Sequence, residues 1–313
     1  MRPGFSIIFL TTLIGAGQGL FLALYGAELA ARLGLLGAAP DDRFFVGGAL
    51  LSLLFTGLGA IASLFHLGHP ERAWRAMAMW RTSWLSREGI AMLGFMGLVV
   101  LYAGAHFIAS PASVALGALA ALLCVGLFVC TGMIYACIRF LQEWAHPLTV
   151  VNYVVLGCAS GLTLATAFAA FAAPPLVVPY GLIAIGLTAL GLLSRSAALL
   201  RNGRIRHRSN LQSAIGVHHP RIVQKAQGQM GGSYNTREFF HGRTRAVLRS
   251  IKWFFLVTAF VLPALLLGAG LAGASAGLLC AAFVLQYGGL LAERWFFFAQ
   301  ANHPQNLYYQ TIS

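Results

Sequence analysis

The sequence predicts an all-α integral membrane protein, a bundle of eight transmembrane helices with both termini in the cytoplasm. Three observations support this class. The chain is 58% hydrophobic, with a mean hydropathy of +0.76. Only 9% of its residues are charged, against about 25% in soluble domains. Its Lys and Arg residues gather in loops that would share one side of a membrane.

Each apolar segment is long enough to cross about 30 Å of hydrocarbon as a helix. Irregular backbone and open sheet edges cannot face lipid, so helices are the expected form. The longest polar stretch, residues 201–245, is too short for a soluble domain, so residues 1–313 form a single transmembrane domain. We expect the spans at residues 5–31, 44–65, 88–109, 112–138, 149–172, 176–199, 247–269 and 272–298.

The ends of the spans follow local signals. The first span runs on without a small-residue cleavage site, so we interpret it as a retained helix and not a signal peptide. The second stops before His66, His69 and Pro70, and Ser86 is a plausible N-cap for the third. Short Gly- and Pro-rich turns join the later pairs of spans: "IASPAS", "FAAPPLVVP" and "GAGLAGAS".

The charges define the two sides of the membrane. Of the 21 Lys and Arg residues, only Arg32 and Arg43 fall on the side opposite the termini. Such a bias in short loops places the basic side in the cytoplasm. A net charge of +13 could suggest nucleic acid, but the basic residues lie between apolar segments and form no soluble basic face. We therefore expect lipid and no nucleic acid as a partner.

The connection between the second and third spans carries dense chemistry in "HLGHPERAWRAMAMWRTSWLSREG". Trp74, Met77, Arg81 and Trp84 recur at three- and four-residue spacing, which predicts one face of a short interfacial helix. His66 and Glu88 would flank this connection at the same membrane face, with Glu88 in the first turn of its helix.

Two functions fit this arrangement. A quinone ring stacks on aromatics, a histidine can hydrogen-bond a quinone carbonyl, and a carboxylate can exchange the protons of the redox step. Alternatively, the tryptophans form an aromatic belt and the two polar residues only cap helices. Spacing alone leaves both open.

The loop after the sixth span holds a second motif, "GQMGGSYNTREFFHG". It mixes glycines, aromatics and both signs of charge, which is typical of a protein-docking surface, although a disordered basic tether is the alternative. The upstream "RNGRIRHRSN" could bind lipid headgroups. The predicted docking residues are Tyr234, Asn235, Arg237, Glu238, Phe239 and His241.

Other cofactors are not expected in this chain. The five cysteines are scattered through apolar segments without a CxxC motif, so we predict neither an iron–sulfur cluster nor a metal site. Only His106 among the histidines falls within a predicted span, and it has no partner at the same depth for a bis-histidine haem. Glu28 is the acidic residue nearest to the interior of a span, so no acidic proton wire is expected.

Both motifs, together with the C-terminal "NHPQNLYY", resemble the membrane-anchor subunits of the dimethyl sulfoxide reductase family. The resemblance covers nearly the whole chain and is strongest to the anchors of the family's quinone-linked sulfite dehydrogenase branch.

The resemblance implies an oxidoreductase complex of the bacterial inner membrane, with a molybdopterin catalytic subunit and an iron–sulfur subunit. Its anchor binds ubiquinone or menaquinone and no haem, and the family's quinone-site histidine and glutamate correspond to His66 and Glu88. Arg72, Trp84 and Arg87 are expected as weaker neighbours.

With the charged face in the cytoplasm, the partner subunits would dock there and electrons would run from sulfite to quinone. Two alternatives remain. A related anchor could oxidise quinol for a sulfoxide-type reductase. A small-solute transporter is the alternative of another class, which the scarcity of intramembrane polar residues and of interrupted helices disfavours.

Overall fold

Every regular element in the described part of the chain is helical. The computed structural model describes residues 1–37, 39–206, 208–223 and 241–304. Within these residues eight helical segments are long and apolar enough to cross a membrane, which confirms the predicted class and the predicted number of spans. The sidedness of the termini stays a prediction.

The spans begin and end within a few residues of the predicted positions. They are α1 (Phe5–Arg32), α2 (Asp42–Leu64), α3 (Trp84–Phe107), α4 (Ser113–Ala136), α5 (Pro147–Ala172), α6 (Val177–Asn202, extended at its start by the 3-10 turn η2, Pro174–Leu176), a seventh span in three parts, and α11 (Ala276–Ala299).

The seventh span, Arg245–Ala272, is not a uniform α-helix. It comprises α9 (Arg245–Leu256), the π-helical turn η3 (Val257–Val261) and α10 (Leu262–Ala272). Pro263 follows the turn and has no N–H to continue a regular ladder. Gly289 of α11 packs against the backbone of Ala259 in the π turn. A Cβ on residue 289 would lie 2.4 Å from the Ala259 nitrogen. The span stays continuously helical through this turn, from Arg245 to Ala272.

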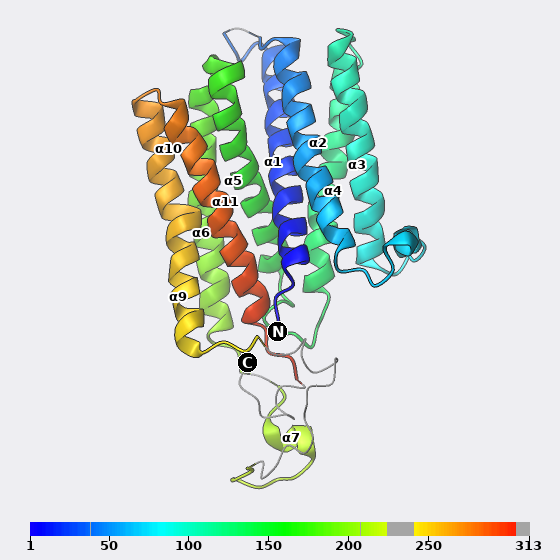
Figure 1. Ribbon diagram of the computed structural model, residues 1–313, viewed down its shortest axis with the longest axis vertical. Coiled ribbons are helices and arrows are strands. Elements are labelled where there is room, and N and C mark those ends of the chain that lie inside the picture. The colour runs from blue at the N-terminus through cyan, green and yellow to red at the C-terminus, as the bar shows by residue number, and fades with distance from the viewer. Residues whose placement is uncertain (38, 207, 224–240, 305–313) are drawn as a thin grey trace.

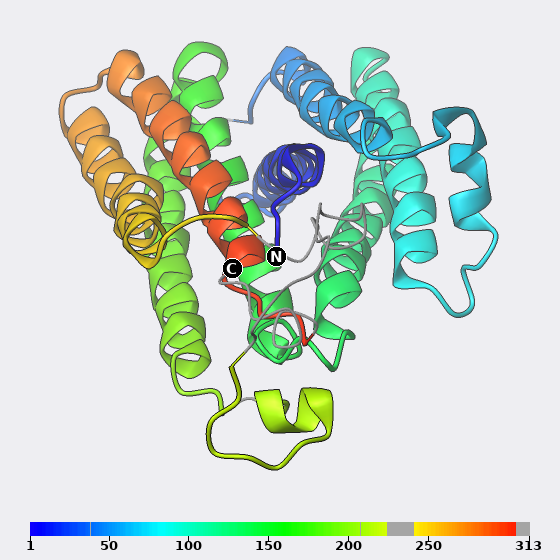
Figure 2. The same ribbon diagram turned by 60° about the horizontal axis from the view of Figure 1, so that its bottom comes forward.

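Helix α1 lies at the centre of the bundle. Its most apolar window is 78% buried, against 33–39% for six of the other spans, and only α5, at 67%, is comparable. Figure 2 shows α1 surrounded by the other helices. The α1–α5 contact is close because Gly19 and Gly161 face each other, and a Cβ on Gly161 would lie 2.3 Å from the Gly19 Cα. Small residues permit such backbone approach between membrane helices.

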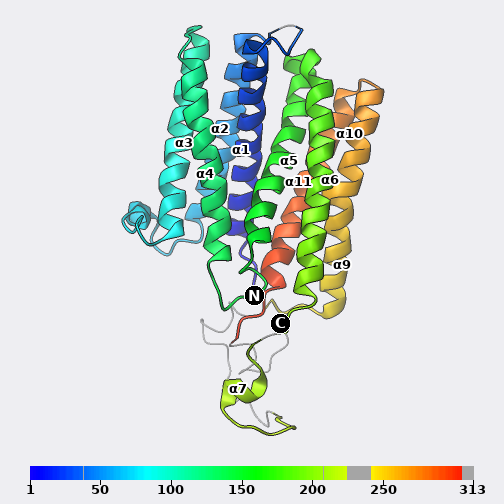
Figure 3. The same ribbon diagram turned by 180° about the vertical axis from the view of Figure 1, so that it is seen from behind.

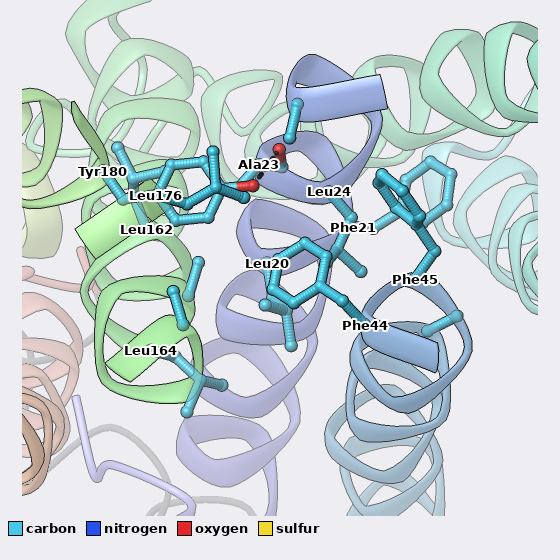
Figure 4. Close-up of a cluster of buried hydrophobic side chains, with 14 of the residues drawn as sticks. Leu20, Phe21, Ala23, Leu24, Phe44, Phe45, Leu162, Leu164, Leu176 and Tyr180 are labelled. Carbon is cyan, nitrogen blue, oxygen red and sulfur yellow. Dashed lines mark hydrogen bonds between the residues drawn. The ribbon is translucent and has the colours of Figure 1, made fainter. Parts of the chain in front are cut away.

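Apolar side chains fill the bundle around α1. Figure 4 shows part of this core, in which Phe21 and Leu24 of α1 lie near Phe44 and Phe45 of α2. The Tyr180 hydroxyl donates a hydrogen bond of 2.8 Å to the carbonyl oxygen of Ala23. This bond ties α6 to the central helix.

The two ends of the bundle differ in form (Figures 1 and 3). Both termini lie at one end, where the Met1 ammonium donates to the carbonyl oxygen of Ala301 at 3.0 Å. The same end carries the α2–α3 connection and the short helix α7 (Leu211–Ile215). Brief turns close the opposite end. The structure thus reproduces the expected division into a polar-loop side and a short-turn side.

Candidate quinone site

The α2–α3 connection contains the predicted short helix, as the 3-10 helix η1 (Pro70–Met77), followed by turns. This helix ends before Arg81 and Trp84, which the spacing had placed on the same helix face. It projects beside α3, away from the bundle (Figure 2). Trp74 and Trp80 are exposed, as expected of an interfacial aromatic belt. The aromatic-belt interpretation of this connection therefore stays open. The first turn begins at Pro70, whose fixed φ suits a helix start.

Helix α3 begins four residues earlier than predicted. Ser83 is its N-cap and accepts a hydrogen bond from the Ser86 N–H at 3.4 Å, so the assignment of Ser86 as the cap was wrong. Ser86 instead donates its hydroxyl to the carbonyl oxygen of Ala76. Glu88 consequently lies in the second turn and not the first. The boundary was misplaced because Ser86 and Arg87 interrupt the apolar pattern within the first turn.

Arg87 and Trp84 form the base of this connection. The Arg87 guanidinium lies 4.4 Å from the centre of the Trp84 ring. It also donates hydrogen bonds to the carbonyl oxygens of Trp80, at 2.9 Å, and Arg81, at 2.7 Å. These contacts hold the connection against the start of α3.

His66 lies just beyond the end of α2 and is exposed. Partial burial nevertheless lowers the pKa of His66, so the imidazole is neutral at neutral pH and can either donate or accept a hydrogen bond. Arg72 is farther along, where its Nε lies 3.8 Å from the Glu71 carboxylate. Both partners of that pair are exposed.

An apolar groove runs along the end of α2 that precedes His66. It lies between α1 and α2, has a volume of about 390 Å³, and is lined by Ser6, Phe9, Leu13, Leu58, Ile61, Ala62 and Phe65. Its last residue, Phe65, directly precedes His66. Ligand sites for small molecules are typically about 300–1,000 Å³ and mostly apolar. The groove and the neighbouring imidazole therefore fit a quinone.

Glu88 has different surroundings. It is buried, with 7% of its surface exposed, and accepts a 2.5 Å hydrogen bond from the Thr131 hydroxyl of α4. It borders a small cavity of about 20 Å³. A cavity needs about 10–15 Å³ to accommodate one water. The cavity has room for a water but not for a quinone ring.

Neither the groove nor the cavity is lined by both His66 and Glu88. The groove beside His66 uses Phe9 and Leu13 of α1, whereas the cavity beside Glu88 uses Thr11 and Gly15. These sets are offset by two residues, or roughly 200° of rotation. The two sites consequently lie on opposite faces of α1.

Buried charges near the cavity were not predicted. Arg195 Nε of α6 lies 2.6 Å from Glu293 Oε1 of α11. The guanidinium of Arg294, which lines the cavity, stacks 3.8 Å from the centre of the Tyr153 ring. From the sequence, Arg195, Glu293 and Arg294 were counted among the charges of the polar-loop side, but all three are buried inside the bundle. Isolated charges within the apolar runs "LLSRSAALL" and "LLAERWFFF" were the available signal.

The remaining candidate residues are placed as follows. His241 lies beside α11, with its ring centre 6.5 Å from that of Trp295. Among the described residues, no three His, Cys, Asp or Glu side chains are grouped to hold a metal ion. The other docking candidates lie outside the described residues: Tyr234, Asn235, Arg237, Glu238 and Phe239.

The chain is similar to known proteins over its whole length. Residues 1–299 match the family described as "DMSO reductase anchor subunit (DmsC)". The chain belongs to this family. A sulfite dehydrogenase subunit of Allochromatium vinosum is 51% identical over 326 aligned positions, which cover 100% of both chains. The protein is thus a membrane anchor subunit of the DMSO reductase type, similar to a subunit of an oxidoreductase complex, as the resemblance predicted.

Proposed function

We propose that this anchor subunit passes electrons from a sulfite-oxidising complex to the quinone pool of the bacterial inner membrane. The observation that carries the proposal is the 51% identity, over the full length of both chains, to a protein named as a subunit of sulfite dehydrogenase. Sulfite and water yield sulfate, two protons and two electrons. Quinone takes up two electrons and two protons to become quinol, so the two half-reactions balance.

The quinone head binds at His66, and its apolar tail lies in the groove between α1 and α2. A neutral imidazole can donate a hydrogen bond to a quinone carbonyl, and the groove ending at Phe65 is apolar. Trp84 and Arg87 hold the connection that borders this position. Arg72 lies farther out, in a pair with Glu71, and is the weakest member of the site.

Glu88 exchanges protons and does not touch the quinone. Its carboxyl group is buried beside a cavity with room for one water, which suits transfer of a proton through a hydrogen-bonded water. Its only described hydrogen-bond donor is Thr131. This divides the predicted pair of residues into a quinone ligand, His66, and a proton-exchange residue, Glu88.

The partners in this proposal are an iron–sulfur subunit and a molybdopterin catalytic subunit on the cytoplasmic face. The Lys and Arg bias of the polar-loop side supports that orientation. The loop at residues 201–245, with His241 beside Trp295, is the proposed docking surface. Quinol oxidation for a sulfoxide reductase would use the same anchor in reverse, but the similar protein's name favours sulfite.

The test uses the purified complex and two electron acceptors. We expect sulfite-dependent reduction of both a soluble quinone analogue and ferricyanide, which can take electrons from the soluble subunits directly. His66→Ala should reduce only the quinone activity, while the matched variant His69→Ala should reduce neither. A complex that reduces dimethyl sulfoxide with quinol and does not oxidise sulfite would contradict the proposal that sulfite is the substrate. Full quinone activity in His66→Ala would contradict the site.

A further inference from the structure

At the end of the bundle opposite the termini, four consecutive spans each supply one polar side chain to a single cluster. Glu28 comes from α1, Asp42 from α2, His106 from α3 and Ser113 from α4. We call these four residues the His106 cluster. It lies at the short-turn end, where α1 leads into α2 and α3 into α4 (Figure 1).

The imidazole of His106 lies between two carboxylates. Its Nδ1 is 2.7 Å from Asp42 Oδ1, and its Nε2 is 3.5 Å from Glu28 Oε2. The Ser113 hydroxyl donates a 2.5 Å hydrogen bond to the second oxygen of Glu28. His106 thereby links Asp42 to Glu28, and Glu28 in turn holds Ser113, so the cluster joins four helices.

The cluster is shielded on most sides and open on one. Side-chain exposure is 3% for Glu28 and 5% for His106, but 51% for Asp42. The Phe45 ring stacks on the imidazole at a centroid distance of 4.4 Å, and Tyr102 meets it edge-on at 4.7 Å. Asp42 is therefore the route by which water and protons reach the buried pair.

Three buried polar atoms of this site lack a hydrogen-bond partner: Glu28 Oε2, His106 Nε2 and the Tyr102 hydroxyl oxygen. A carboxylate buried without a partner is costly, and a neutral imidazole would leave two carboxylates without any cation. Among the described residues, no Lys or Arg pairs with Glu28, Asp42 or His106. The other titratable neighbours are phenols: Tyr25 on α1, Tyr102 on α3 and Tyr180 on α6.

We propose that the His106 cluster is a proton-binding site: a proton taken up through Asp42 is held on the imidazole and joins α1, α2, α3 and α4. The bound proton converts two carboxylate–histidine contacts into ion pairs in a buried setting. When the pH rises, the proton leaves through Asp42 to water and both pairs are lost. Stability therefore falls as the pH rises through the titration of His106 in the folded protein.

The experiment measures the thermal midpoint of the complete complex across the range in which histidine titrates, about pH 5 to 8. We expect the wild-type midpoint to fall with rising pH by about 5 °C. His106→Gln should have a low midpoint that no longer depends on pH. His69→Gln is the matched control, because His69 also pairs with a carboxylate, Glu71 at 3.0 Å, but both side chains are exposed to solvent. It should behave as the wild type does.

A second variant keeps the test decisive if His106→Gln does not assemble. Asp42→Asn removes one carboxylate, so the fall in midpoint should move to lower pH. In proteoliposomes, changing the pH only on the side of Asp42 should reproduce the effect, and changing it only on the side of the termini should not. A pH dependence that survives in His106→Gln, or that does not move in Asp42→Asn, would overturn the proposal.

Discussion

Glu28 and Glu88 are both buried in the membrane-spanning part of this protein, and their surroundings differ. Glu28 is held by a histidine at 3.5 Å and a serine at 2.5 Å, at the short-turn end of the bundle. Glu88, toward the other end, has one described donor, Thr131, and borders a cavity with room for a water. A carboxylate surrounded by fixed partners stabilises structure, whereas one with few partners and a water can exchange a proton.

The largest expected effect is on turnover at Glu88. Glu88→Gln removes the exchangeable proton but keeps the shape of the side chain. Quinone-linked sulfite oxidation should fall by about 10²–10³-fold, while ferricyanide reduction and assembly stay normal. Glu71→Gln is the control, because it alters an exposed carboxylate of the same connection. Near-normal quinone activity in Glu88→Gln would remove this residue from the proton path.

Glu28 should respond in the opposite sense. Glu28→Gln breaks a buried contact between a carboxylate and a histidine, which costs about 3 kcal/mol of unfolding free energy. Denaturant or thermal unfolding of the purified complex would reveal it, and quinone turnover below the unfolding range should be within about twofold of wild type. If turnover fell as far as in Glu88→Gln, the proposed division between the two glutamates would fail.

A smaller effect is expected at Thr131. Thr131→Val removes the hydrogen bond to Glu88 without changing the size of the side chain, and turnover should fall about tenfold. The same substitution at Thr11 is the control. Thr11 lines the same cavity, but its hydroxyl donates to the carbonyl oxygens of Ile7 and Ile8. Equal losses in both variants would mean that cavity polarity matters and not the bond to Glu88.

The smallest effect concerns pH and His66. Because partial burial lowers the pKa of His66, the neutral imidazole persists from alkaline pH to below its ordinary value of about 6.5. The apparent KM for a quinone analogue should be constant down to that pH and rise about threefold below it. His66→Gln should abolish this rise. An increase that already begins above neutral pH would contradict the assignment.

The sequence was sufficient for the fold because each span is a long apolar segment that must be helical in lipid. It was not sufficient for pairings between helices. The contact of His106 with Glu28 joins residues far apart in the chain, and helical periodicity gives a face but not its neighbour. The same reason explains why Arg195 and Glu293 were not predicted to pair.

Local errors have local causes. The start of α3 was predicted at residue 88, with Ser86 as its N-cap, because both Ser83 and Ser86 suit an N-cap and only the fold decides between them. The π turn at Val257–Val261 packs against Gly289 of another helix, a contact that the local sequence does not reveal. His66 and Glu88 were expected in one pocket because they flank one connection, but the inward rotation of α3 directs Glu88 to α4.

Helix α1 is synthesised first, yet most of the surface that covers it is made later. Its Gln18 amide donates to the Cys124 carbonyl oxygen of α4, Gly19 meets Gly161 of α5, and Thr12 lies 3.2 Å from the Tyr287 hydroxyl of α11. During insertion the Gln18 amide lacks this partner until α4 arrives. A polar group without a partner is costly in lipid, so we expect α1 to reach its final packing only after α4, α5 and α11 have been inserted.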